Sequence, residues 1–198
     1  AKIEYSDESD VAVVVLEATE KPSGEVLSYI ADECGIRTRQ LYALVVPTSS
    51  IAGSVQISGR IAEMGLHKLM YVGFDPKKVL SVYGVAPIAP VHPKFSRAMG
   101  RTNDMLLFAG VTYFTVSAEE DDELNLWEKG YKEKVPSCSS NDYGRPFAEV
   151  LKAAGNDFYK IDPGLFAPAM VVVNNVRTGS TFTAGKLNTE ALRLSVCI

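Results

Sequence analysis

The run VAVVVL at residues 11–16 is the first stretch of this 198-residue chain that decides its fold. Its length and its β-branched composition are those of a strand covered on both faces of its sheet. A second apolar run, LYALVV, occupies residues 41–46. Between the two, PSG at 22–24 opens an amphipathic helix over residues 25–34, which Gly35 ends. Strand, helix and strand in this order predict an α/β fold.

The rest of the chain continues this alternation and predicts mixed sheets covered by helices. Segments rich in β-branched and aromatic residues predict strands, and Thr178-Gly179-Ser180 predicts a hairpin turn. The expected strands are 79–85, 111–116 and 170–173, and the expected helices are about 95–108, about 145–154 and a short C-terminal one.

One internal boundary is expected, near residues 117–136. The acidic run 119–123 is interpreted as a helix start or a solvated loop rather than a binding site. An amphipathic stretch around Trp127 follows it. The chain otherwise contains no internal repeat and no low-complexity segment, so we treat residues 1–198 as one unit.

Composition and charge exclude several classes of protein. A net charge of -4 and a pI near 5.3, without clustered Lys and Arg, argue against a nucleic-acid partner. No apolar run approaches the roughly 18 residues of a membrane span, and no basic flank leads into a signal core. With 46% hydrophobic residues the chain can bury a core, and we expect a cytoplasmic protein without a membrane partner.

The cysteines and histidines predict neither a disulfide framework nor a metal site. Cys34, Cys138 and Cys197 are odd in number and far apart, which suits free thiols. His67 and His92 are the only histidines, and neither has a metal-ligand spacing or a carboxylate cluster around it. A Cys138 nucleophile would need one of them nearby in space.

The stretch PTSSIAGSVQISGRIAE at residues 47–63 is the main candidate for a functional site. It is expected to run from a strand end through a Ser/Gly-rich turn into a helix that carries Arg60 and Glu63. Three helical residues correspond to roughly 300 degrees of rotation, so both charges lie on nearly one face. The pattern is not a P-loop, because five residues separate Gly53 from Gly59 and Lys is absent.

Two interpretations of this stretch are open from spacing alone. Arg60 and Glu63 can form a surface ion pair that contributes roughly 0.2 to 0.5 kcal/mol to helix stability. Alternatively, Ser54, Gln56 and Ser58 make the neighbourhood polar without lysines, as in a ligand pocket. The loops at 137–146 and 159–164 are equally ambiguous, since Asp, Asn, Pro and Gly also specify ordinary turns.

Several blocks in fixed order resemble one family, the methenyltetrahydromethanopterin cyclohydrolases. Together they span nearly the whole chain, which makes the resemblance far more specific than any single motif. The blocks are YALVVPT (42–48), GSVQISGRI (53–61) with Glu63, TND (102–104), VPSC (135–138) with DYG (142–144), DFYKIDP (157–163), FAPA (166–169) and GKLN (185–188).

The resemblance implies a family-specific cyclohydrolase fold and a reaction on a pterin. Water adds to the cationic methenyl carbon of 5,10-methenyltetrahydromethanopterin, and the ring opens to the 5-formyl product. Glu63 is expected to deprotonate that water, and Arg60 to orient the carboxylate and favour its ionised form. The electrophile is already a cation, so neither a metal nor a cofactor is expected.

Further roles follow from the resemblance alone. Family members are described as homotrimers that begin well upstream, so we expect a homo-oligomer and a chain that lacks the family's N-terminal portion. The remaining blocks are expected to line the pterin site. These substrate-binding candidates are Ser54, Gln56, Ser58, Asn103, Asp104, Tyr143 and Tyr159. The alternatives are a non-catalytic pterin-binding or assembly protein and a phosphate-binding enzyme.

Overall fold

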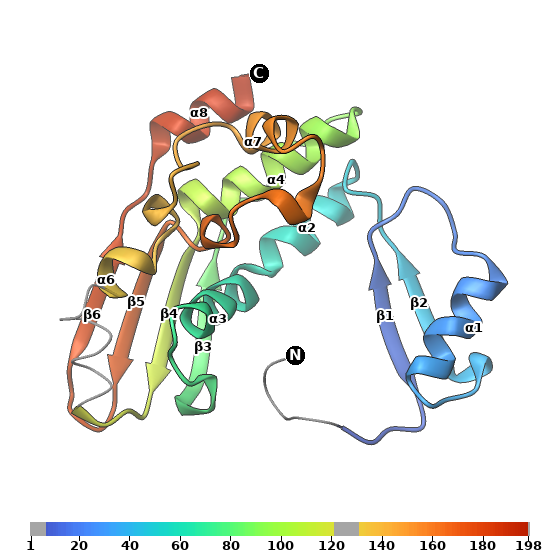
Figure 1. Ribbon diagram of the computed structural model, residues 1–198, viewed down its shortest axis with the longest axis horizontal. Helices are drawn as coiled ribbons and strands as arrows, with labels where there is room; N and C mark the ends of the chain where they lie inside the picture. The colour runs from blue at the N-terminus through green and yellow to red at the C-terminus, as the bar shows by residue number, and fades with distance from the viewer. Residues whose placement is uncertain (1–6, 121–130, 198) are drawn as a thin grey trace.

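The computed structural model describes residues 7–120 and 131–197 and is a mixed α/β structure (Figure 1). Trp127 and the end of the acidic run, residues 121–123, lie outside the described residues. The main elements are β1 (Ala12–Leu16), α1 (Gly24–Glu33), β2 (Leu41–Val45), α2 (Ile51–Gly59), α3 (Ile61–Tyr71), β3 (Val79–Val85), α4 (Phe95–Ala109), β4 (Val111–Val116), α6 (Tyr131–Lys134), α7 (Phe147–Ala153), β5 (Met170–Asn175), β6 (Thr181–Gly185) and α8 (Thr189–Cys197).

The first strands pair as predicted, but they form a small sheet of their own. β1 and β2 are parallel, with Ala12 opposite Leu41 and Leu16 opposite Val45. The expectation that the first run is covered on both faces is wrong. Alternate residues along β1 are exposed, and Val13 keeps 65% of its surface accessible. Within the described chain α1 packs against this pair, and Figure 1 shows no second layer beyond it.

The larger sheet has four strands in the order β3-β4-β5-β6. β4 and β5 are parallel, whereas β3 and β6 pair antiparallel at the edges. The predicted hairpin turn at Thr178-Gly179-Ser180 joins β5 to β6, and Gly179 supplies its positive φ of 77°. The predicted strands therefore exist, and they pair as a mixed sheet.

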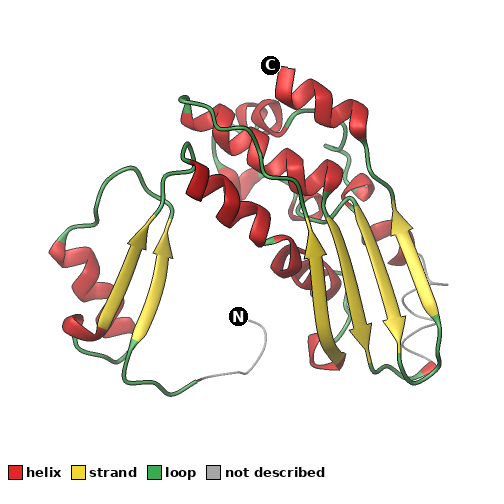
Figure 2. Ribbon diagram, turned by 180° about the vertical axis from the view of Figure 1, so that it is seen from behind, coloured by secondary structure: helices red, strands yellow, loops and turns green. Residues whose placement is uncertain are grey.

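Helices cover one face of this sheet (Figure 2). Residues of β4 and β5 that point toward α3 are buried, including Phe114, Val171 and Val173, which join Leu69 of α3 in one core. A second core lies between α4, α7 and α8 and contains Phe147. The opposite face stays open in the described chain, where Tyr83 is 65% exposed beside Tyr113.

The stretch 47–63 follows the predicted order of strand end, turn and helix, but its helical part is divided between two helices. The turn occupies residues 48–50, residues Ile51–Gly59 form helix α2, and Ser50 caps this helix by accepting the Gly53 N–H at 2.9 Å. Arg60 then ends α2 and begins α3. Position 53 of this helix requires glycine, because a Cβ there would overlap the carbonyl oxygen of Pro47. Close packing, not turn formation, requires this glycine.

Candidate functional site

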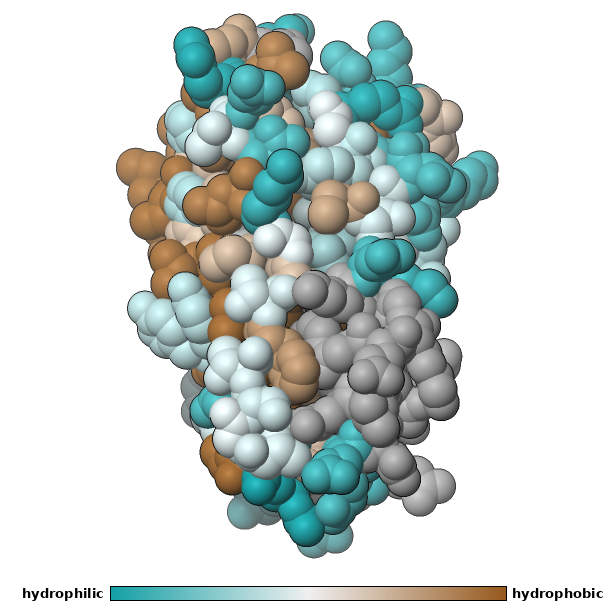
Figure 3. Space-filling view, turned by 90° about the vertical axis from the view of Figure 1, so that its left-hand side faces the viewer, coloured by the Kyte–Doolittle hydropathy of each residue, from teal (hydrophilic) through white to brown (hydrophobic). Residues whose placement is uncertain are grey.

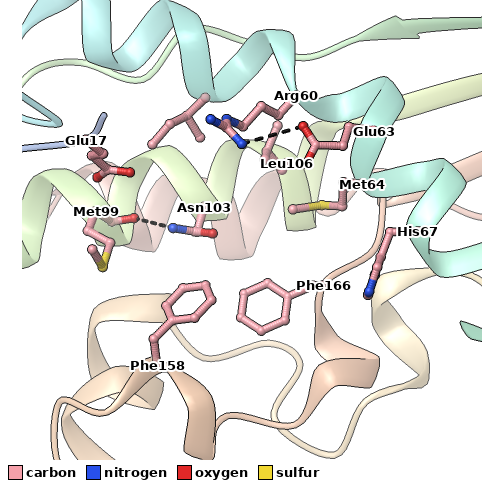
Figure 4. Close-up of a pocket in the computed structure, with 11 residues that line it drawn as sticks. Glu17, Arg60, Glu63, Met64, His67, Met99, Asn103, Leu106, Phe158 and Phe166 are labelled. Atoms are coloured by element: carbon pink, nitrogen blue, oxygen red, sulfur yellow. Dashed lines mark hydrogen bonds and ion pairs between the residues drawn. The ribbon is translucent and has the colours of Figure 1, made fainter. Parts of the chain in front are cut away.

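A cavity of about 320 Å³ lies where α3, α4 and the segment 158–166 meet (Figure 4). Its walls combine charged and apolar side chains, the composition that small-molecule sites commonly have. The lining residues are Glu17, Ile57, Arg60, Glu63, Met64, His67, Met99, Asn103, Leu106, Phe158 and Phe166.

Arg60 reaches this cavity from the bend between α2 and α3. Its backbone N–H still donates to the carbonyl of Ile57 at 3.0 Å, while its own carbonyl accepts the Met64 N–H at 2.8 Å. The side chain is held by Gln56, whose Oε1 accepts the Arg60 Nε–H at 2.9 Å. Gln56 is not among the residues that line the cavity, but this hydrogen bond orients the Arg60 guanidinium, which does line it.

Glu63 stands in the first turn of α3, three residues after Arg60. A negative charge at this end of the helix interacts favourably with the helix dipole. Glu63 Oε2 lies 3.5 Å from Arg60 Nη1, and the two side chains are 70% and 48% exposed. As a surface ion pair this contact contributes little. Its place on the wall of a cavity is what favours the functional interpretation.

Helix α4 supplies another wall of the cavity through one face. Met99, Asn103 and Leu106 recur at the helical spacing and all three line the cavity. Asn103 is 8% exposed and its Nδ2 donates to the carbonyl of Met99 at 2.9 Å. Of the two polar residues predicted on this helix, the structure brings Asn103 to the cavity and turns Asp104 away from it.

Two phenylalanines form the aromatic wall of the cavity. Phe158 and Phe166 stack with ring centroids 4.8 Å apart and an interplanar angle of 30°. Both rings also contact Phe147 of the core, at 6.0 and 5.9 Å. The wall is therefore anchored on the α4–α7–α8 core and presents apolar ring surface to the cavity. Figure 4 shows both rings across the cavity from Arg60.

Glu17, the residue after β1, contributes a second carboxylate. Desolvation by its surroundings raises the pKa of Glu17, and the positive charge of Arg60 lowers it in part. No short-range pattern in the sequence marks this residue. It reaches the cavity only because β1 ends beside the start of α2.

Several predicted binding residues are engaged elsewhere. Ser54 Oγ donates to the carbonyl of Ala89 at 2.7 Å, and Ser58 Oγ donates to that of Pro87 at 2.7 Å. Both hydroxyls are buried and hold the loop after β3 against α2. They fix the position of α2 instead of lining the cavity.

The other three predicted residues also lie away from this cavity. Asp104 accepts the Phe147 N–H at 2.9 Å and the Ser195 hydroxyl, and so joins α4 to α7 and α8. Tyr143 packs edge-on against Phe108 at 5.3 Å. Tyr159 is 96% exposed, and its neighbour Phe158 faces the cavity instead.

No group of three or more His, Cys, Asp or Glu side chains that could hold a metal comes together among residues 7–120 and 131–197. Cys34, Cys138 and Cys197 are free and exposed. In the same part of the chain, no helix is long and apolar enough to cross a membrane.

The fold and the cavity together define an α/β protein with a cavity, between charged groups and stacked aromatic rings, of the kind that small-molecule sites have. A family model described as Cyclohydrolase (MCH) matches residues 1–196, and the chain belongs to this family.

Curated relatives agree with this membership. The chain is 48% identical over 196 residues to the methenyltetrahydromethanopterin cyclohydrolase of Methanocaldococcus jannaschii. The aligned part covers 98% of this chain and 59% of that protein. The chain is 49% identical over 195 residues to the enzyme of that name in Methanothermobacter marburgensis, covering 98% and 60%. The enzyme of Methanococcus aeolicus is 46% identical over 196 residues, with 98% and 59% covered. The chain thus spans about 59% to 60% of the length of these relatives.

Proposed function

We propose that this chain carries the water-activating side of an active site that hydrolyses 5,10-methenyltetrahydromethanopterin to its 5-formyl derivative. The observation that carries the proposal is the pairing of Arg60 and Glu63, 3.5 Å apart, on the wall of a cavity faced by stacked aromatic rings. Family membership and the names of the relatives support the choice of substrate.

Glu63 acts as the general base on a water that faces the methenyl carbon. As the water oxygen bonds to that carbon, one water proton passes to the Glu63 carboxylate. Glu63 returns this proton to the nitrogen that leaves as its bond to the carbon breaks. The hydroxyl proton goes to solvent and a formyl C=O forms, so one cation and one water give a neutral product and one proton.

Arg60 has two tasks in this scheme. It holds the Glu63 carboxylate toward the water, and its positive charge stabilises the carboxylate's orientation through the 3.5 Å contact. Gln56 keeps the guanidinium in place through the 2.9 Å hydrogen bond. The rings of Phe158 and Phe166 offer a flat surface for the pterin, and the carboxylates of Glu17 and Glu63 attract its positive charge.

The substrate carbon is already electrophilic, so we propose that the reaction uses neither a metal nor a redox cofactor. We also propose that the protein is cytoplasmic and a homo-oligomer, a trimer by family resemblance. The exposed Tyr83 and Tyr113 on the open face of the sheet support association between copies. Light scattering of the purified protein measures the oligomeric state directly.

The test is to mix the full-length protein with 5,10-methenyltetrahydromethanopterin and follow the loss of the methenyl absorbance, with and without a chelator. Decay that the chelator does not change is the expected result. Binding without decay would instead identify a pterin-binding or assembly protein. Turnover that depends on magnesium and a nucleotide would identify a phosphate enzyme.

A further inference from the structure

Lys68 is a buried charged residue that the scheme above does not use. It lies on α3 one residue after His67, is 1% exposed, and is among the largest fully buried side chains of the described chain. Its ammonium lies 5.5 Å from the ring centroid of Tyr71, within cation–π range. A buried ammonium is costly unless hydrogen bonds satisfy it, so its contacts indicate what it holds.

Those contacts lie in the loops that carry the aromatic wall. Lys68 Nζ donates a short hydrogen bond to the carbonyl of Gly164 and lies 3.5 Å from Ser139 Oγ. From the other side, Asp162 Oδ1 accepts the Gly164 N–H at 2.9 Å, and Ser140 Oγ donates to Asp162 Oδ2 at 2.8 Å. Both polar groups of Gly164 are therefore fixed by charged side chains.

The clamped residue stands two positions before Phe166. Leu165, between them, is 1% exposed in the α4–α7–α8 core, so the segment can move little once Gly164 is held. Helix α3, which carries Lys68, presents Glu63, Met64 and His67 to the same cavity. Lys68 thus connects the helix of the candidate base to the loop of the aromatic wall.

We propose that Lys68 is a positioning residue that sets the separation between the Glu63 helix and the Phe166 wall, and so determines how tightly a flat substrate fits between them. The effect of Lys68 on KM and kcat rests on the proposed function, because it is measured with the proposed substrate. Lys68 touches no reacting atom, and its effect passes through Gly164 and Phe166.

The charge state of Lys68 agrees with this placement. Burial lowers its pKa, and the nearby charges of Asp162 and Cys138 raise it in part. Lys134 and Tyr71 line the same cavity as Lys68. The protonated form has the donors that the Gly164 carbonyl needs, so the link is a charge-assisted hydrogen bond.

The experiment compares Lys68→Met with the wild-type full-length protein. Methionine fills a similar volume but has no donor. Lys160→Met is the matched control, because Lys160 is 71% exposed and pairs with Asp157 on the neighbouring turn. Lys68→Gln keeps one donor and replaces the Met variant if that variant does not fold. The measurements are KM and kcat for 5,10-methenyltetrahydromethanopterin, and hydrogen exchange of peptides covering residues 162–167.

A positioning role predicts a rise in KM of about tenfold for Lys68→Met with kcat within about threefold, because stacking against the wall binds substrate and transition state alike. Exchange of the 162–167 amides becomes faster in this variant and stays unchanged in Lys160→Met. Lys68→Gln gives an intermediate KM. An unchanged KM, or exchange that rises equally across the whole chain, overturns the inference. If the wild type binds no pterin, the proposed function fails, and the exchange measurement alone decides whether Lys68 holds this loop.

Discussion

Arg60 and Glu63 are held by different means, and the difference suits their proposed tasks. Arg60 is fixed on one side by Gln56 at 2.9 Å and contacts Glu63 on the other at 3.5 Å. Glu63, with 70% of its side chain exposed, is held by that 3.5 Å contact, which is longer and weaker than the hydrogen bond from Arg60 to Gln56. A fixed guanidinium beside a less constrained carboxylate allows that carboxylate to approach a water and still keep its partner.

Glu63→Gln removes the proposed base and keeps the size of the side chain. We expect turnover to fall by roughly 100-fold or more, because a positioned base typically contributes that much, while substrate binding and unfolding stay close to wild type. Stopped-flow decay of the methenyl absorbance and urea unfolding check both parts. Glu190→Gln, an exposed change in the first turn of α8, is the matched control. Turnover within threefold of wild type in Glu63→Gln would remove the assignment.

Glu17→Gln tests whether the second carboxylate attracts the cationic substrate. We expect KM to rise several-fold and kcat to change little, because an ionised carboxylate in the cavity favours binding of a cation. In the wild type, KM rises as pH falls through the pKa of Glu17, which burial raises. In Glu17→Gln, KM no longer rises as pH falls, and KM depends less on salt concentration because one attractive charge is gone. Glu20→Gln serves as control, and equal KM values for all three proteins would contradict this role.

At the scale of elements, the contact between α3 and β4 places Glu63 above the sheet. Gly65 permits this contact, since a Cβ there would lie 2.8 Å from Thr112 Cγ2 and 2.9 Å from Phe114 Cζ. The helix axis therefore approaches the strand more closely than any other residue type allows. The position of helix α3, which carries Glu63, therefore depends on this glycine.

Gly65→Ala should destabilise the protein by about 1 to 3 kcal/mol, because the added methyl group overpacks the interface. Gly59→Ala is the control in the neighbouring helix, where no atom lies within 4 Å of the added Cβ. There the better helix propensity of Ala should stabilise by up to about 1 kcal/mol. Urea unfolding measures both values. Equal effects of the two changes would show that α3 does not depend on close contact with β4.

The sequence predicts most elements because apolar runs and turn residues report local structure directly. The run at 41–46 and the turn at Thr178-Gly179-Ser180 are of this kind, and both are confirmed. The sequence does not fix where helix α2 begins, because the Ser and Gly residues of this stretch are also turn residues. Nothing local reveals that Gly53 packs against the Pro47 carbonyl.

The candidate site is only partly readable for the same reason. Arg60, Glu63 and Asn103 line the cavity, and helical spacing relates the first two. The aromatic prediction falls one residue away, since the turn at Phe158–Lys160 sends Tyr159 to solvent and Phe158 to the cavity. Met64 and His67 follow Glu63 at positions of the same helical face, a signal that was present in the sequence. The position of Glu17 at the cavity can be recognised only from the tertiary fold.

At the scale of the whole molecule, apolar surface is concentrated where the described chain has no covering layer. Val13, Tyr42 and Leu44 of the small sheet are at least half exposed, and Tyr83 lies on the open face of the large one. Figure 3, viewed from the β6 side, shows hydrophobic residues gathered along one margin. Such patches are typical of surfaces that contact other protein segments.

Asp104 makes the stability of the whole molecule depend on pH. Its carboxyl joins α4 to α7 and α8, and burial raises its pKa from 3.8 to about 7, although hydrogen bonds from Ser195 and Phe147 lower it in part. A raised pKa means that the folded state holds a proton which the unfolded state has released. This contribution to stability is therefore complete below pH 3.8 and is lost as pH rises through about 7.

Asp104→Asn removes that titration and keeps both contacts, because the amide oxygen can accept the Phe147 N–H and the amide nitrogen can donate to Ser195. We expect the variant to match the wild type near pH 3.8 and to become more stable than it as pH rises to about 7, by an amount on the order of a few kcal/mol. Urea unfolding at several pH values measures the two slopes. Asp142→Asn, at a partly exposed ion pair with Arg145, is the control and should follow the wild type. Parallel slopes for Asp104→Asn and wild type would mean that Asp104 is ionised in the folded protein throughout this range, and that the link between the three helices is a charged one.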